Sequence, residues 1–87
     1  MKTYSIKQSR YSAYSGNVRE SVFTGTLEEL IDKFSYTLEK GHSWERERGN
    51  KKINMHPTTI RALITNLNNA ENNAAANGYS GTSYSLA

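Results

Sequence analysis

The clustered carboxylates are the residues of this sequence that come closest to a catalytic pattern. Paired carboxylates can act as general acid and general base when they face one another, and four of them lie close together: Glu28, Glu29, Asp32 and Glu39. All four flank an apolar stripe at helical spacing, which favours a solvated helix face. The alternative is an acidic contact surface for a basic partner.

Metal and phosphate chemistry have no matching pattern in this chain. His42 and His56 lack a histidine partner at i+4, and the chain has no cysteine, so metal-ligand spacing is not met and a thiol nucleophile is excluded. We interpret His56 as a residue that caps the helix after it. The glycines are scattered and form no phosphate-binding loop. We therefore expect a protein that is not an enzyme and takes no cofactor or metal.

Tyrosine is unusually frequent, with six residues against only two phenylalanines. Tyr11 and Tyr14 lie in or beside a turn rich in Ser, Gly and Asn, and Tyr79 lies in a similar stretch near the C-terminus. Tyrosine among such residues is typical of binding surfaces, because its rigid ring offers contact area and a hydrogen bond at low entropy cost. We predict contact roles for these three residues, and ordinary exposed loop positions are the alternative.

Basic side chains lie near aromatic residues in two segments of the chain. Arg10 and Arg19 flank the first turn, and the second segment contains Trp44, Arg46, Arg48, Lys51 and Lys52. Such residues could stack on bases and neutralise phosphates. Because Glu45 and Glu47 interrupt the second segment and no RNA-binding motif is present, nucleic acid is the second choice of partner. The predicted partner-binding set is Arg10, Tyr11, Tyr14, Arg19, Trp44, Arg46, Arg48, Lys51, Lys52 and Tyr79.

These residues must be positioned first by an N-terminal hairpin. Residues 2–8 alternate apolar and polar side chains, as a half-buried strand does. Residues 15–17 (Ser-Gly-Asn) have the conformational freedom that a turn requires. A second strand is expected over residues 18–23, antiparallel to the first.

A helix is expected after the hairpin. Thr26 and Glu29 have the spacing of a capping box, in which the hydroxyl and the carboxylate each accept a backbone N–H. Leucine, isoleucine and phenylalanine then recur at helical spacing, so we predict a helix over residues 27–40. Gly41 is expected to end it.

The second half of the chain is predicted to contain a loop, two strands and another helix. Residues 42–50 have the mixed charge of an exposed loop, and residues 51–55 are expected to form a short strand. Pro57 is expected at the first position of a helix, where its missing N–H has no cost. This helix becomes rich in asparagine before it stops at residues 77–78, and a last strand is expected over residues 83–87.

Length and composition favour one small α+β domain over residues 1–87. The predicted order is β-β-α-β-α-β, and a small antiparallel or mixed sheet with two helices packed on one face would bury both apolar stripes. The hydrophobic fraction of 36% allows only a modest core. No apolar run is long enough to span a bilayer and no signal peptide is recognisable, so we expect a cytoplasmic protein without a membrane partner.

The sequence as a whole resembles the small accessory proteins of bacteriophages, including anti-CRISPR inhibitors. The likeness lies in its short length, the absence of cysteine, the Tyr/Ser-rich hairpin, the segment FTGTLEEL at 23–30 and the closing NGYSG at 77–81. It involves no shared motif, so no functional residue is carried over. It implies an inhibitor that docks on a bacterial nuclease or CRISPR effector in the host cytoplasm and blocks DNA binding or assembly. The net charge of +3 differs from that of acidic DNA mimics and favours blocking by shape or by occupying an acidic protein surface.

Overall fold

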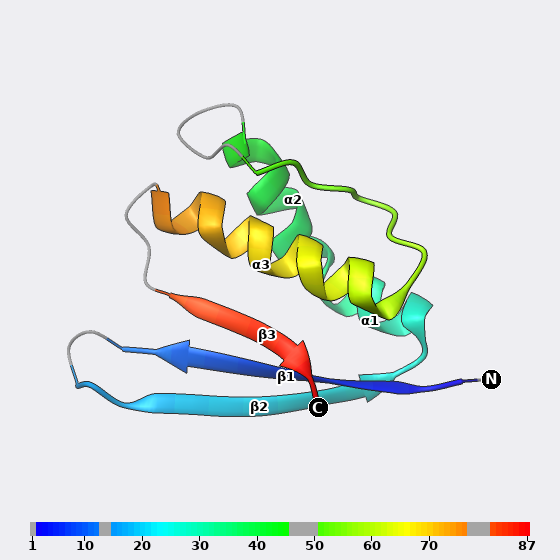
Figure 1. Cartoon of the computed structure of the whole chain (residues 1–87), viewed down its shortest axis with the longest axis horizontal. Helices are drawn as coiled ribbons and strands as arrows, with labels where there is room; N and C mark the ends of the chain where they lie inside the picture. The colour runs from blue at the N-terminus through cyan, green and yellow to red at the C-terminus, as the bar shows by residue number, and fades with distance from the viewer. Residues whose placement is uncertain (1, 13–14, 46–50, 77–80) are drawn as a thin grey trace.

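The computed structural model describes residues 2–12, 15–45, 51–76 and 81–87. Its elements are β1 (Tyr4–Tyr11), β2 (Val18–Gly25), α1 (Leu27–Lys33), α2 (Ser35–Glu45), α3 (Ile60–Ala76) and β3 (Thr82–Leu86). The strands form one layer, and all three helices lie on the same face of it (Figure 1). The α+β class is confirmed, but the order is β-β-α-α-α-β, with three helices and three strands in the described residues.

The sheet is antiparallel with the order β2-β1-β3. The expected hairpin is present and pairs residues from Tyr4 opposite Gly25 to Tyr11 opposite Val18. Gly16 in its turn has φ 69°, a left-handed conformation that glycine adopts without steric cost. The expected C-terminal strand pairs with the other side of β1. The first strand of the chain is therefore the centre of the sheet.

Side-chain alternation divides the sheet into a covered face and an open face. Ile6, Gln8 and Tyr84 are buried beneath the helices. Val22 and the other even-numbered residues of β2 face away from the helices. The ring of Phe34 packs edge-on against Tyr84 and Phe23, with centroid distances of 5.5 and 5.2 Å. These aromatic contacts join the sheet to the junction of α1 and α2. The rest of the core comprises Leu30, Leu38, Ile53, Leu63, Leu67 and Ala70.

The capping box at the start of α1 is confirmed. Glu29 N donates to Thr26 Oγ1 at 3.2 Å, and Thr26 N donates to Glu29 Oε1 at 2.9 Å. The single helix predicted over 27–40 is wrong in one respect, because the chain leaves helical geometry at Phe34 and continues as a second helix to Glu45. Part of the loop predicted over 42–50 is therefore helical.

Gly41 does not end a helix, and its lack of a side chain serves packing. It is buried inside α2, where an added Cβ would overlap the Cβ of Ala70 and lie 2.5 Å from its Cα. The Gly41 carbonyl also accepts a hydrogen bond from Asn73 Nδ2 at 3.0 Å. The backbone of α2 is thus in direct contact with α3, and glycine is required at this crossing.

The predictions for residues 51–57 are wrong. Residues 51–54 form no strand, and α3 begins at Ile60 instead of Pro57. Thr59 caps α3, since its Oγ1 accepts a hydrogen bond from Ala62 N at 3.1 Å. The side chain of His56 does not have the capping role expected for it.

Asparagine side chains on α3 take the place of strand pairing for the 51–54 segment. Asn73 Oδ1 accepts from Lys51 N at 3.1 Å and its Nδ2 donates to Lys51 O at 2.9 Å. Asn66 Oδ1 accepts from Asn54 N at 2.7 Å, and Asn69 Nδ2 donates to Lys52 O at 3.5 Å. The asparagines at 66, 69 and 73 share one helix face at i, i+3 and i+7 spacing. This spacing was the signal in the sequence that would have distinguished them from a merely polar helix end.

Candidate binding groove

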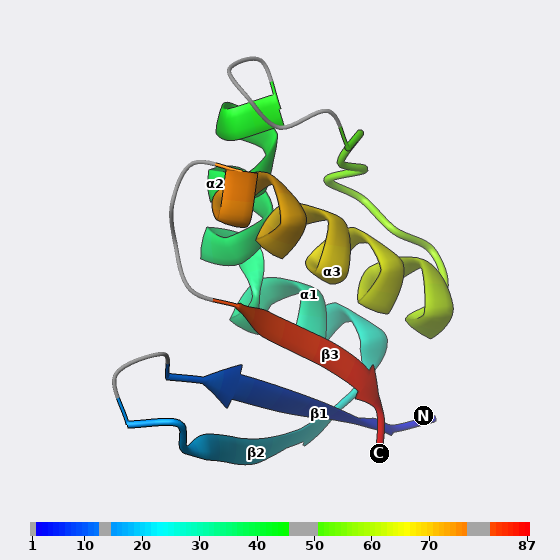
Figure 2. The ribbon, with the colours of Figure 1, turned by 60° about the vertical axis from the view of Figure 1, so that its left-hand side comes forward.

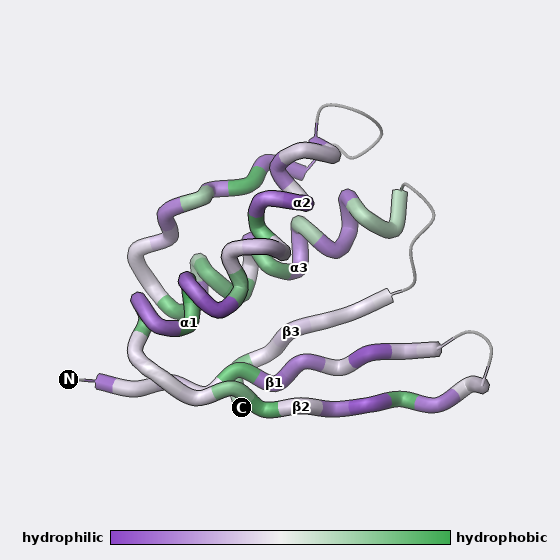
Figure 3. Tube along the Cα trace, turned by 180° about the vertical axis from the view of Figure 1, so that it is seen from behind, coloured by the Kyte–Doolittle hydropathy of each residue, from purple (hydrophilic) through white to green (hydrophobic). Residues whose placement is uncertain are grey.

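A groove of about 620 Å³ opens between the hairpin end of the sheet and α2. The hairpin extends beyond the helical layer (Figures 1 and 2), so this end of the covered sheet face is accessible from the side. The hairpin half of β1 and β2 is predominantly hydrophilic (Figure 3). Side chains from the sheet and from α2 and α3 line the groove, among them Gln8, Arg10, Tyr11, Arg19, Tyr36, Lys40, Glu71 and Tyr84.

Two arginines form one wall of the groove. Arg10 and Arg19 are directly opposite each other in the β1–β2 register, and both are exposed. Neither guanidinium forms an ion pair with a residue that the structure describes. Like charges at directly opposed positions destabilise an antiparallel pair. The planar fork of a guanidinium matches carboxylate and phosphate geometry, so the pair suits an anionic ligand.

A hydrogen-bonded network forms the floor of the groove. Gln8 Nε2 donates to the Tyr84 hydroxyl at 3.1 Å, and that hydroxyl donates to Glu71 Oε1 at 3.4 Å. Lys40 Nζ lies 3.9 Å from the same carboxylate oxygen. Burial raises the pKa of Tyr84, with a further contribution from the charge of Glu71, although the hydrogen bond from Gln8 acts in the opposite direction. The floor thus holds a neutral hydroxyl in a fixed orientation. The lining of the groove contains three cationic side chains, Arg10, Arg19 and Lys40, and one carboxylate, that of Glu71.

Two exposed tyrosines are among the residues that line the groove, Tyr36 from α2 and Tyr11 from the end of β1, where its position opposite Val18 directs its side chain toward the open face of the sheet. Tyr11 is 53% exposed and Tyr36 is 74% exposed. Tyr36 and Lys40 are four residues apart on α2 and share one side of that helix. Tyr36 and Lys40 are not part of the site predicted from sequence, because only the packing of α2 brings them to the hairpin. A smaller depression is lined by Tyr36, Lys40 and the half-buried Trp44.

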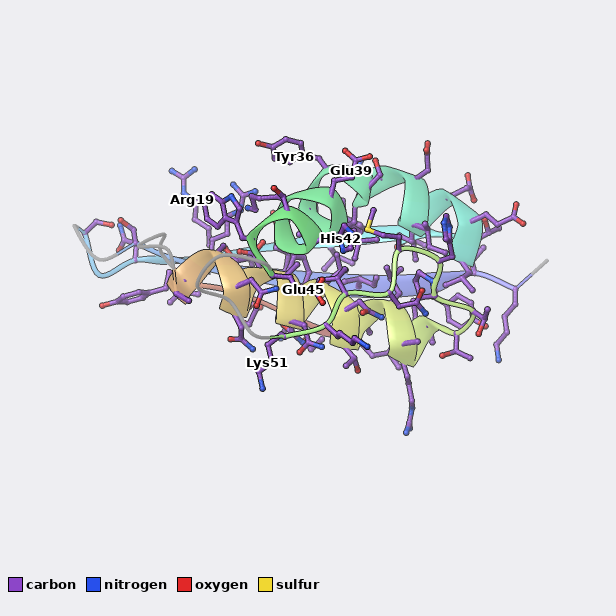
Figure 4. The ribbon with its side chains drawn as sticks, turned by 90° about the horizontal axis from the view of Figure 1, so that it is seen from above. Arg19, Tyr36, Glu39, His42, Glu45 and Lys51 are labelled. Carbon is purple, nitrogen blue, oxygen red and sulfur yellow. The ribbon has the colours of Figure 1, made fainter. Side chains whose placement is uncertain are left out.

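The structure brings some of the predicted partner-binding residues together and separates others. Arg10, Tyr11 and Arg19 line one groove. Figure 4 shows Arg19 and Tyr36 pointing to one side of the molecule, with Lys51 on the opposite side. The exposed Lys51 and its neighbour Lys52 therefore do not extend the groove. The remaining predicted residues, Tyr14, Arg46, Arg48 and Tyr79, lie outside the described part of the chain.

The histidine–carboxylate pair in the described residues lies outside the groove. His42 Nδ1 and Glu45 Oε2 are 3.1 Å apart on one surface of α2, with side-chain exposures of 49% and 21%. The carboxylates of Glu28, Asp32 and Glu39 are exposed, as their sequence pattern indicated. Within the described residues no group of three or more potential metal ligands occurs, and no helix has the length and apolarity needed to cross a membrane.

Comparisons of this chain with protein-family models, with curated proteins and with solved structures find no match. The residues of the groove are therefore the basis for assigning a function.

Proposed function

We propose that this chain is a non-catalytic binding protein whose groove receives an acidic segment of a partner protein. The observation that carries the proposal is the directly opposed pair Arg10 and Arg19, two exposed guanidiniums without a carboxylate partner among the described residues. A carboxylate between them would relieve their repulsion and accept hydrogen bonds from both. The exposed ring of Tyr36 would supply contact area for the same segment.

An acidic protein segment fits this groove better than a nucleic acid does. Non-specific binding of a nucleic-acid strand depends on cations and stacking rings distributed along a track. Here Arg10, Arg19 and Lys40 converge on one compact groove, and Lys51 lies on the other side of the molecule. The affinity for a strand of phosphates should accordingly be low and should fall steeply with salt.

The biological role we propose is that of a phage-type inhibitor that occupies an acidic surface of a bacterial defence or nucleic-acid-processing complex. This role is supported by the resemblance of the sequence to phage accessory proteins and by the excess of cations in the groove. A binding protein without catalysis inhibits by occupying a surface, and a groove of this size can engage a few side chains tightly while the surrounding surface excludes water.

The first test compares two probes on the isolated protein. Fluorescence anisotropy with a labelled polyglutamate peptide should show binding that Arg10→Glu abolishes and that the matched charge reversal Lys52→Glu leaves unchanged. A labelled single-stranded oligonucleotide should bind more weakly at every salt concentration. Equal peptide binding by the Arg10→Glu variant would refute the groove. Tighter binding of the oligonucleotide, lost in the same variant, would replace the acidic partner with a nucleic acid.

The second test measures the stability of the protein without a ligand. Arg10→Gln removes the like-charge opposition to Arg19, so it should raise the free energy of unfolding by about 0.2–1 kcal/mol while it lowers peptide affinity. Urea denaturation of the variant and of wild type provides the measurement, and Lys52→Gln is the matched control. A loss of stability in Arg10→Gln would mean that Arg10 serves folding rather than binding.

A third test identifies the partner. The wild-type protein, Arg10→Glu and Lys52→Glu are immobilised and exposed to nuclease-treated bacterial lysate. A protein retained by wild type and by Lys52→Glu, but not by Arg10→Glu, is the predicted partner, and its bound surface should be acidic. Retention that disappears after nuclease treatment would contradict the proposal.

A further inference from the structure

The two edges of the sheet differ in whether their backbone groups are satisfied. On β3, Asn68 Oδ1 accepts from Tyr84 N at 2.8 Å, and Asn68 Nδ2 donates to Tyr84 O at 3.0 Å. This side-chain amide closes the β3 edge at its centre in the way that a neighbouring strand would. No such group meets the edge of β2 within the described residues.

The register identifies which backbone groups of β2 are free. Ser12 N donates to Asn17 O, and the ladder pairs Arg10 with Arg19 and continues in this register to the start of β1. Because hydrogen bonding alternates along an antiparallel ladder, odd-numbered residues of β2 bond to β1. The groups that point outward belong to the even-numbered residues Val18, Glu20, Val22 and Thr24.

Apolar side chains accompany this free edge. Val18 and Val22 are 58% and 59% exposed on the open face of the sheet. Natural edge strands are usually short, charged, bulged or covered, since a long exposed edge is a template for pairing with another strand. β2 has eight residues, and no proline or described bulge interrupts it. We conclude that the β2 edge is suited to accept a strand.

The charge pattern of the strand and of the helix after it selects a second copy as the occupant. A two-fold axis at Val22 would place Val22 opposite its own copy, Glu20 opposite Thr24, and Arg19 opposite Gly25 of the second chain. Glu29 lies over Gly25, with its Cβ 3.2 Å and its Oε1 3.3 Å from the position of an added Cβ. Arg19 of each chain would thus meet the carboxylate of Glu29 in the other chain, and the symmetry forms this ion pair twice.

The two registers shifted toward the start of β2 lack this complementarity. An axis at Glu20 would oppose two carboxylates on the same face. An axis at Ser21 would direct Arg19 to the ring of Phe23, above which the Lys33 ammonium already lies at 5.0 Å from the centroid. The arrangement around Val22 has neither conflict.

We propose that this chain forms a two-fold homodimer through antiparallel pairing of β2 with β2 of a second copy, which joins two three-stranded sheets into one. The proposal does not rest on the acidic partner of the groove, although the two would share one side chain. Arg19 is shared by the two surfaces, whereas Val22 and Glu29 are not among the residues that line the groove. Variants at these two positions therefore leave the lining of the groove unchanged.

The test measures molar mass by light scattering coupled to size exclusion over a dilution series. Wild type should be a dimer that dissociates on dilution. Val22→Pro should be monomeric with an unchanged circular dichroism spectrum, because it deletes an N–H that the monomer does not use. Thr82→Pro deletes an outward N–H on the other edge and should leave the dimer intact. A monomeric wild type at every concentration, or a dimeric Val22→Pro variant, would overturn the proposal.

Charge variants test the register. Glu29→Gln keeps the capping oxygen but removes the charge, and two weakened ion pairs should raise the dissociation constant about 2- to 30-fold. Arg19→Glu should weaken the dimer further, because it places two carboxylates opposite each other. The double variant Arg19→Glu/Glu29→Arg should restore it, provided that its circular dichroism spectrum shows that α1 stays folded without the capping carboxylate of Glu29. A double variant as weak as Arg19→Glu alone would refute the proposed axis.

Discussion

Replacement of Gly41 by alanine tests whether the contact between α2 and α3 outweighs local helix propensity. Glycine in the interior of a helix costs about 1 kcal/mol relative to alanine, so propensity alone predicts that Gly41→Ala stabilises the protein. The structure predicts the opposite sign. The new Cβ would overlap the Cβ of Ala70 and lie 2.5 Å from its Cα, and neither atom can move away by a side-chain rotation.

The net effect can be estimated from these two opposing contributions. Overpacking of a well-packed contact costs up to about 3 kcal/mol, and the gain in propensity offsets about 1 kcal/mol of it. Displacement of α2 would also lengthen the hydrogen bond from Asn73 to the Gly41 carbonyl. We expect Gly41→Ala to lower the free energy of unfolding by about 2 kcal/mol, which corresponds to a decrease in Tm of about 10 °C for a domain of this size.

Thermal and urea denaturation followed by circular dichroism measure this effect. Gly81→Ala is the matched control, because nothing lies within 4 Å of the position of its added Cβ, and the smaller entropy of the unfolded chain should stabilise this variant by about 0.4–1 kcal/mol. A Gly41→Ala variant as stable as wild type, or more stable, would refute the direct contact between the two helices.

Three other variants test the polar contacts. Asn73→Ala should lower the free energy of unfolding by about 3 kcal/mol, because it leaves buried backbone groups unpaired, whereas urea denaturation should show little effect of exposed Asn72→Ala. Hydrogen bonds from Thr26 lower the pKa of Glu29 from 4.5. Urea titrations should therefore show a higher free energy of unfolding for wild type than for Glu29→Gln, fully above pH 4.5 and less as the pH falls below it. A difference in free energy that does not change with pH would contradict the capping role. Burial raises the pKa of Tyr84 from 10.0. The contribution of the neutral hydroxyl to the free energy of unfolding should therefore be complete below pH 10 and be lost as the pH rises above it. Tyr84→Phe should lack this loss of stability at alkaline pH in the same titrations.

Local signals in the sequence were sufficient for the elements that depend on neighbouring residues. The capping box at Thr26 forms within one helical turn, and the turn that contains Gly16 lies between two strands of alternating pattern. Both predictions needed no knowledge of tertiary contacts. The prediction for Gly41 is wrong for the opposite reason, because the role of this glycine depends on Ala70 of α3, which is distant in the sequence.

The residues of the candidate groove also divide into those that local signals bring together and those that only tertiary packing brings together. Arg10 and Arg19 flank one turn, so hairpin formation alone brings them opposite each other. Tyr36 and Lys40 join them only because tertiary packing brings the first turns of α2 to the same groove. The strand predicted at 51–55 failed because the asparagines of α3 supply the hydrogen bonds that a strand partner would have supplied. The strand propensity of a segment does not indicate which side chains elsewhere in the chain will bind its backbone.

The central position of β1 has a consequence for synthesis on the ribosome. Translation proceeds from the N-terminus, so β1 and β2 emerge early and can pair, whereas β3 follows only after all three helices. Until then one long side of the middle strand has no hydrogen-bonding partner, and Tyr84 is missing from the aromatic cluster around Phe34. A nascent chain therefore carries an unfinished sheet with two open sides until β3 has emerged, which makes this interval a period of exposure to aggregation and to chaperone binding.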